Sequence, residues 1–178
     1  METAMRLISG LLILGCLVAS TPAFACGPEV RIQFAEDSPD RFRIEFVRGP
    51  KQQVTSLQVN LNGSAAGVIF DDYDGLGAQG PQPGPSGVTI RSVTYRASGA
   101  ETVALTFEGF TEQRIVDFNS DLDDHGRAGD PDQNHINEGE LTGATAQATL
   151  LSTNGRHIVI SGQFDKLGHA RLGDRACV

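Results

Sequence analysis

The chain has 178 residues and a mass of 18.9 kDa, a length that favours a single domain. Its formal net charge of −8 argues against binding to nucleic acid or to anionic membrane surfaces, because both attract clustered Lys and Arg. With 21 Gly, 8 Pro and no Trp, the composition favours short strands joined by many turns over a helical bundle.

Residues 1–25 have the pattern of a cleaved secretory signal peptide. Arg6 supplies a positive charge, Leu7 to Ser20 form an apolar stretch, and Ala23-Phe24-Ala25 places small residues before a cleavage point. No later segment approaches the roughly 18 to 20 apolar residues that a membrane span needs. We therefore expect an exported protein, periplasmic or extracellular, in which residues 26–178 form a single β-sandwich domain.

Two of the three cysteines remain after removal of the signal. Cys26 and Cys177 lie at the two ends of the mature chain, and disulfides persist in exported proteins, so we expect these residues to form a disulfide. The alternative is a lipid on Cys26 as the first mature residue. A lipoprotein signal has a Leu-like residue three positions before that Cys and a small residue two before, where this chain has Ala23 and Phe24.

Apolar and polar residues alternate along the mature chain, a pattern typical of half-buried strands. Together with the turn residues between the apolar runs, it predicts an all-β fold, an antiparallel β-sandwich or jelly roll of about nine or ten strands. The apolar positions of the expected strands are Val30–Phe34, Phe42–Phe46, Leu57–Leu61, Val68–Phe70, Val88–Tyr95, Val103–Phe107, Ile115–Phe118, Ala144–Leu150 and Ile158–Ile160.

Two segments between these strands are expected to be turns or loops. Asn62-Gly63 is a tight-turn dipeptide that predicts a hairpin, and this turn also explains the glycosylation-like triplet that ends at Ser64. The segment from Gly75 to Gly87 is rich in Gly and Pro and predicts a long surface loop, because each Pro removes a backbone donor.

The negative charge is concentrated in two places. The window from Asp117 to Glu140 contains eight acidic residues and one basic residue, Arg127, and so carries a charge of −7. Asp71, Asp72 and Asp74 add −3, whereas the remainder of the mature chain carries about +2. Local acidity of this kind points to a cation, because calcium prefers about six to eight oxygen ligands and accepts ligands from loops.

Two segments of the acidic window have the oxygen spacing of a calcium loop. Asp121-x-Asp123-x-His125-Gly126 resembles the start of such a loop, although His125 replaces the usual Asp or Asn. Asp130-x-Asp132-x-Asn134 repeats the spacing without the glycine. The candidate calcium ligands are Asp71, Asp72, Asp74, Asp121, Asp123, Asp124, Asp130, Asp132 and Asn134.

The acidic window has other interpretations. If it continues a strand, then Asp117, Asn119, Asp121 and Asp123 share one face and repel one another unless a cation or solvent relieves them. It is also compatible with a solvated acidic loop, or with a pair of carboxylates that act as acid and base in a hydrolase. The absence of Trp counts against carbohydrate binding, and the four His show no zinc-binding spacing.

Three stretches resemble a small exported bacterial family described as aggregation-factor-core-like. They run from Leu57 to Asp71, from Phe118 to Asp124 and from Glu140 to Ala144. The resemblance implies a secreted β-sandwich-like module associated with calcium-dependent adhesion, with acidic positions at Asp71 and at the Asp121, Asp123 and Asp124 group. It implies no catalytic residues.

The sequence therefore favours a non-enzymatic exported module that binds calcium through its acidic loops and interacts with an extracellular protein or glycan. A periplasmic or secreted hydrolase that uses paired carboxylates is the alternative. A structural module with an incidental acidic loop is the third hypothesis.

Overall fold

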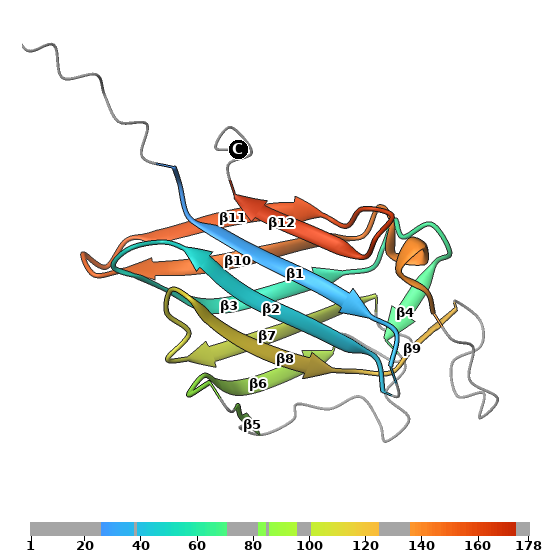
Figure 1. The fold of residues 1–178 in the computed structure, drawn as a ribbon, viewed down its shortest axis with the longest axis horizontal. Coiled ribbons are helices and arrows are strands. Elements are labelled where there is room, and N and C mark those ends of the chain that lie inside the picture. Colours follow the sequence, from blue (N-terminus) through green and yellow to red (C-terminus); the bar gives the residue numbers. More distant parts are fainter. Residues whose placement is uncertain are drawn as a thin grey trace, which may run out of the picture.

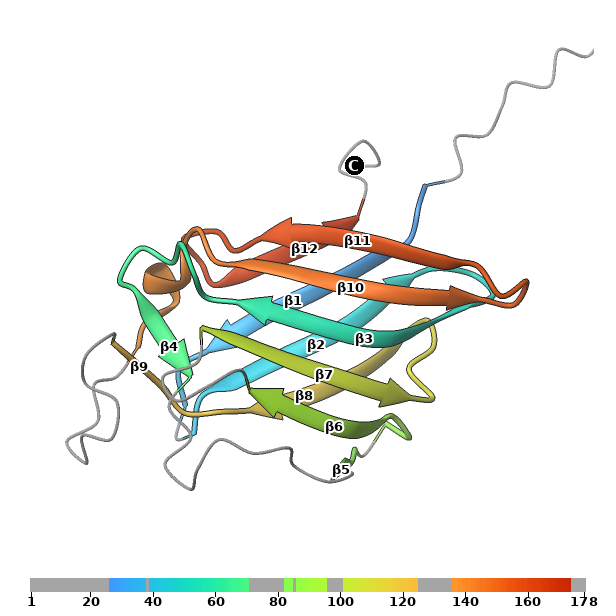
Figure 2. The same ribbon diagram turned by 180° about the vertical axis from the view of Figure 1, so that it is seen from behind.

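The computed structural model describes residues 26–37, 39–70, 82–84, 86–95, 101–124 and 136–173. These residues form antiparallel sheets packed face to face around one core (Figure 1, and from behind in Figure 2), which confirms the all-β sandwich. The elements are β1 (Glu29–Ala35), β2 (Arg41–Arg48), β3 (Gln52–Asn60), β4 (Val68–Phe70), β5 (Gln82–Pro83), β6 (Thr89–Tyr95), β7 (Thr102–Glu108), β8 (Arg114–Asn119), β9 (Leu122–Asp124), the 3-10 turn η1 (Glu138–Leu141), β10 (Thr145–Ser152), β11 (His157–Gln163) and β12 (His169–Gly173).

The strands form two large sheets and one small one. One large sheet has four strands in the order β12-β1-β2-β8, and the other has six in the order β11-β10-β3-β7-β6-β5. The short strands β4 and β9 pair only with each other and lie together at one end of the sandwich (Figure 1). No helix among the described residues is long and apolar enough to cross a membrane.

The alternating sequence pattern explains the core. In β1 and β2 every second residue is apolar and buried, so each strand turns one row of side chains toward the facing sheet. Phe42 lies at the centre of an aromatic group, with its ring centroid 5.3 Å from that of Phe34 and 6.1 Å from those of Phe70 and Phe118. These contacts join the four-stranded sheet to the small β4–β9 sheet.

A hairpin closes one side of the sandwich. β11 belongs to the six-stranded sheet and β12 to the four-stranded sheet, so the turn between them carries the chain from one sheet to the other. Gly162 of β11 approaches the β12 backbone so closely that a Cβ atom there would lie 2.2 Å from the carbonyl oxygen of Arg171. Only a residue without a side chain allows this contact.

The structure confirms all nine expected strands and adds three short ones, which makes twelve among the described residues. β5 and β9 have two and three residues, and β12 has only two buried apolar residues, Ala170 and Leu172. Segments this short offer at most two alternating apolar positions, too few to predict a strand. β5 also corrects part of the expected Gly/Pro loop, because Gln82 and Pro83 pair with β6 at the sheet edge, where Pro is tolerated.

The expected hairpin at Asn62-Gly63 is wrong, although a turn is present. Gly63 has a positive φ of 94°, as the tight turn requires. The strands on either side do not pair, since β3 pairs with β10 and β7, whereas β4 pairs with β9. The turn instead carries the chain out of the large sheet to the end of the sandwich.

Candidate functional site

The predicted calcium ligands divide into described residues and residues outside the described ranges. Asp121, Asp123 and the backbone of Asp124 are described, in and just before β9. The other predicted ligands, Asp71, Asp72, Asp74, Asp130, Asp132 and Asn134, lie outside the described residues.

The pairing of β4 with β9 relates the two acidic segments of the sequence. Phe70 pairs with Leu122 and Ile69 pairs with Asp123, in antiparallel register. Phe70 and Leu122 form the pair at one end of this two-stranded ladder. Segment 71–74 follows Phe70 in the sequence, and Asp121 precedes Leu122. Two acidic segments about 50 residues apart in sequence are thus joined to one two-stranded sheet.

A further acidic residue, Asp40, lies beside β9, although no sequence pattern marked it as a candidate ligand. Asp40 is buried, and its carboxylate accepts hydrogen bonds from the backbone N–H groups of Asp37 and Leu122. Burial raises the pKa of Asp40 to about 6, against the effect of those hydrogen bonds and with help from the negative charges of Asp121 and Glu36. The carboxyl group is therefore partly protonated near neutral pH.

The backbone around Asp40 is fixed on both sides. Its carbonyl oxygen accepts a hydrogen bond from the N–H of Ser120 at 3.0 Å. The Ser120 hydroxyl in turn lies 3.0 Å from the hydroxyl of Tyr95, and both side chains are buried. The end of β8, the start of β2 and the end of β6 are thus held together, and they place Asp40 beside the β9 strand.

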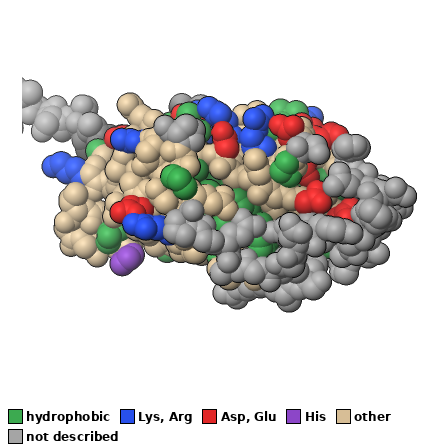
Figure 3. Space-filling view, turned by 90° about the horizontal axis from the view of Figure 1, so that it is seen from below, with side chains coloured by type: hydrophobic (Ala, Val, Ile, Leu, Met, Phe, Trp, Pro, Cys, Tyr) green, Lys and Arg blue, Asp and Glu red, His purple; other side chains and the backbone are tan. Residues whose placement is uncertain are grey.

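The expected single face of alternating carboxylates is corrected by the structure. Asp117 and Asn119 are exposed on β8, but Asp123 is buried. The alternation fails because β8 belongs to the four-stranded sheet and β9 to the small sheet, so the chain changes direction at Ser120 and Asp121. Acidic side chains gather toward the end of the molecule that carries β4 and β9, on the right in Figure 3.

Two further acidic residues of the window have structural roles. Asp117 forms an ion pair with Arg43 across β8 and β2, with an N–O distance of 3.6 Å. Glu140 accepts a hydrogen bond from the N–H of Asn137 at 2.7 Å and completes a capping box on η1. The −7 window is therefore not one functional unit.

Within the described part of the chain, no group of three or more Asp, Glu, His or Cys residues is close enough to hold a metal ion. Asp40, Asp121 and Asp123 supply carboxylates at one end of the sandwich, but they do not form a complete ligand set by themselves. Any calcium site at this end would need oxygen atoms from segments 71–74 or 125–135, which lie outside the described residues.

A second polar region lies on the outer face of the four-stranded sheet, and the sequence analysis did not identify it. Its centre is Glu29, which is buried although charged, with a side chain only 3% exposed. The Glu29 carboxylate contacts Arg31 Nε at 2.7 Å, Arg171 Nη2 at 3.0 Å and Arg48 Nη2 at 3.1 Å. Burial acts to raise the pKa of Glu29, but the hydrogen bonds and charges of Arg31 and Arg171 outweigh it and lower the pKa.

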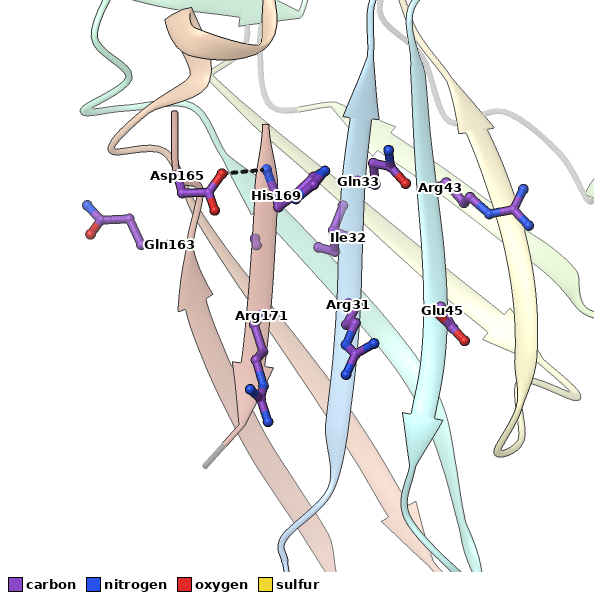
Figure 4. Close-up of a pocket in the computed structure, with 10 residues that line it drawn as sticks. Arg31, Ile32, Gln33, Arg43, Glu45, Gln163, Asp165, His169 and Arg171 are labelled. Carbon is purple, nitrogen blue, oxygen red and sulfur yellow. Dashed lines mark hydrogen bonds between the residues drawn. The ribbon is translucent and has the colours of Figure 1, made fainter. Parts of the chain in front are cut away.

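A groove of about 710 Å³ runs over β12, β1 and β2 beside this cluster. Figure 4 shows Arg31 and Arg171 extending toward one end of it, with Asp165, His169 and Gln33 gathered at the other. The signal for this face was present in the sequence as Arg31, Arg41 and Arg43 at alternate positions of two strands, but their neighbour β12 was not recognised.

The comparisons with known proteins give no family assignment. No protein-family model, no curated protein and no solved structure matches the chain.

Proposed function

We propose that the protein is an exported β-sandwich module that binds calcium at the β4–β9 end and uses the ordered end for interaction at the cell surface or outside the cell. The observation that carries the proposal is the antiparallel pairing of β4 with β9, in which Phe70, the residue before segment 71–74, lies opposite Leu122, the residue after Asp121. The resemblance to the aggregation-factor-core-like family supports the same conclusion, since its acidic positions are Asp71, Asp121, Asp123 and Asp124.

The mechanism is electrostatic. Asp40 is buried near Asp121 and Glu36, and burial together with these like charges disfavours its ionised form. A divalent cation at this end would offset the repulsion and lower the pKa of Asp40. Calcium would therefore bind with release of protons, and would stabilise the fold because it binds the native state only.

The first experiment is a thermal melt of the oxidised protein, expressed from the full sequence and purified. The protein is measured in chelator, in millimolar magnesium and in millimolar calcium at matched ionic strength. We expect a rise of several degrees that is specific to calcium, because a site with mixed loop carboxylates favours calcium over the smaller magnesium ion. Equal melting temperatures in the three conditions would contradict the proposal and favour the structural module with an incidental acidic loop.

A double variant locates the site. Asp121→Asn with Asp123→Asn removes two carboxylates of the β9 segment and should abolish the calcium-dependent rise. The matched control is Glu45→Gln with Glu108→Gln, which changes the net charge equally on β2 and β7 and should leave the rise unchanged. The quantity compared is the calcium-dependent shift, because loss of the buried Asp123 can lower the melting temperature in every condition.

The proposed disulfide between Cys26 and Cys177 is supported by the register of the terminal strands. Glu29 of β1 pairs with Gly173 of β12, so Cys26 lies three residues before and Cys177 four residues after one cross-strand pair. Mass spectrometry of a non-reduced digest should show the two cysteine peptides joined. Separate peptides, or a lipid on Cys26, would contradict this pairing.

No specific observation favours the hydrolase. A hydrolase with paired carboxylates needs one carboxyl group of raised pKa in a pocket. Asp40 has the raised pKa but does not line the groove on the four-stranded sheet, whereas Asp165, which does, has a lowered pKa.

A further inference from the structure

The groove on the outer face of the four-stranded sheet has two chemically different ends. Its lining comes from β12, β1, β2 and the residues around the β11–β12 turn, and its volume of about 710 Å³ falls in the range of small-molecule sites. The Arg, Asp and Glu residues of the lining are Arg31, Arg43, Arg171, Glu45 and Asp165, and its other polar residues are Gln33, Gln163 and His169.

One end carries an excess of positive charge. Arg31 and Arg171 are direct cross-strand partners, and with Arg48 they surround the single carboxylate of Glu29, so three cations share one anion. Each guanidinium has five N–H donors, and the contact with Glu29 uses only some of them. The Nε of Arg171 is buried and makes no hydrogen bond. Glu29 thus fixes the arginines in place and leaves donors for a second anion.

Two other charged residues of the lining are already engaged. Arg43 extends toward β8 in Figure 4, where it pairs with Asp117 at 3.6 Å. The carboxylate of Asp165 accepts the backbone N–H groups of Leu167 at 2.9 Å and His169 at 3.1 Å. Glu45 lies directly opposite Arg31 on β2, so this end has three arginines against two carboxylates, Glu29 and Glu45. The remaining positive charge of the groove therefore lies at the Arg31 and Arg171 end.

The other end offers amide and imidazole groups beside the Asp165 carboxylate. Gln33 pairs with His169 across β1 and β12. Gln163 lies beside them on β11, where its amide nitrogen donates to the carbonyl oxygen of Gly143 at 3.1 Å and its amide oxygen can still accept a hydrogen bond. Amide and imidazole groups both donate and accept hydrogen bonds, as hydroxyl groups of a ligand require. None of the described residues that line the groove carries a phenyl, phenol or indole ring, so a neutral sugar would find no stacking surface.

From this juxtaposition we infer that the groove binds a small hydroxylated anion, a sugar phosphate or a sugar acid. Arg31 and Arg171 hold the anionic group, and Gln33, His169 and Gln163 hydrogen-bond the hydroxyl groups. This site is separate from the β4–β9 end, and its ligand does not depend on calcium.

Two-dimensional NMR of the purified protein in chelator tests the inference. The probes are glucose 6-phosphate, galacturonate, inorganic phosphate and glucose, each titrated at low salt. We expect glucose 6-phosphate or galacturonate to shift the backbone signals of β1 and β12 and the Nε–Hε signals of Arg31 and Arg171, with saturation in the millimolar range or below. The stronger of the two ligands identifies the anionic group.

Inorganic phosphate should bind at least about fivefold more weakly than the better sugar ligand, and glucose should cause no saturable shift. Equal binding of inorganic phosphate would overturn the hydroxyl-binding end, and equal binding of glucose would overturn the anion-binding end. No saturable shift with any probe would overturn the inference entirely.

Three variants assign the residues. Arg31→Gln with Arg171→Gln should weaken binding of the sugar ligand at least about tenfold. Arg91→Gln is the matched control, because Arg91 is equally exposed and ion-paired with Glu108 on the opposite sheet; it should bind as the parent does. Gln33→Ala keeps the Glu29 cluster intact and should weaken binding of the sugar ligand more than that of inorganic phosphate. Unchanged binding in the double variant or in Gln33→Ala would contradict the assignment.

Discussion

Arg31 and Arg171 lie directly opposite each other on β1 and β12, and both guanidinium groups contact the same carboxylate, that of Glu29. Like charges on neighbouring strands destabilise a sheet when nothing separates them. The negative charge of Glu29 offsets the repulsion between the arginines. Its side chain is almost completely buried beneath them. The close packing of the three arginines on this face therefore depends on the carboxylate of Glu29.

Replacement of Glu29 by Gln should destabilise the fold. The variant leaves three arginines without their shared anion, and we expect the free energy of unfolding at pH 7 to fall by about 3 kcal/mol, the lower end of the range for a broken buried ion pair. The lower end applies because the arginines remain partly hydrated. Urea unfolding measures the loss. Glu108→Gln, which breaks an exposed pair with Arg91, is the control and should cost less than about 1 kcal/mol.

The loss of stability caused by Glu29→Gln should depend on pH. The pKa of Glu29 is lower in the folded protein than in the unfolded chain, so its ionisation stabilises the fold above the unfolded pKa. This contribution is lost as the pH falls through the folded pKa. The difference between parent and Glu29→Gln should therefore shrink below about pH 4. A difference that stays constant down to pH 3 would mean that the charge of Glu29 is not its source.

The contribution of Asp40 to stability should change with pH in the opposite direction. Its pKa of about 6 in the folded protein lies above the ordinary value of 3.8, so the folded state binds more protons than the unfolded state between these values. Stability from this group is therefore present at low pH and is lost as the pH rises toward 7, by about 3 kcal/mol in total. In chelator, Asp40→Asn should remove this loss, as measured by urea unfolding at pH 4.5 and pH 7. If the parent and the variant show equal changes, Asp40 does not titrate in this range.

Phe42 should be among the most sensitive core positions. Its ring contacts aromatic rings from β1, β4 and β8, and Phe42→Ala would leave a cavity where the four-stranded sheet meets the small β4–β9 sheet. We expect a loss of about 3 to 5 kcal/mol in the free energy of unfolding, with a smaller loss for Phe42→Leu. Val159→Ala serves as the control, because Val159 is 56% exposed and should change stability by less than about 0.5 kcal/mol. Equal effects at the two positions would show that the aromatic group is not the centre of the core.

A substitution at Gly162 tests how closely β11 packs against β12. An added methyl group would meet the backbone of Arg171, which cannot move aside as a flexible side chain can. Gly162→Ala should therefore lower the free energy of unfolding by about 2 kcal/mol or more. Ser161→Ala, at the neighbouring exposed position of the same strand, should have little effect. A neutral Gly162→Ala would show that β11 and β12 are not packed as closely as described.

The strands could be predicted from the sequence because their signal is local. Ile32 and Phe42 belong to apolar rows with a period of two, and such rows report which side of a strand is buried wherever the strand lies. Strand pairing is not local. Glu29 and Arg171 are 142 residues apart, and nothing in the sequence near either residue indicates the other. The alternate arginines of β1 and β2 were visible in the sequence, but their assembly with Arg171 and Glu29 into a cluster beside a groove could not be predicted.

The candidate calcium site shows the same limit. The spacing of Asp121 and Asp123 was visible in the sequence, but the burial of Asp123 and the involvement of Asp40 follow from the change of sheet between β8 and β9. A period of two predicts a shared face only while the chain stays in one sheet. A sequence pattern does not show where a strand leaves its sheet.

The short segment between β5 and β6 protects the open edge of the four-stranded sheet. The Ser86 hydroxyl donates to the carbonyl oxygen of Ile115 on β8, and the Arg114 guanidinium donates to the carbonyl oxygen of Ser86. Among the described strands β8 pairs with β2 alone, and a strand with an open side is a template for an added strand from another molecule. Because Ser86 occupies that side, another copy of the chain has no free backbone at Ile115 to pair with, and growth of the sheet by strand addition is opposed there.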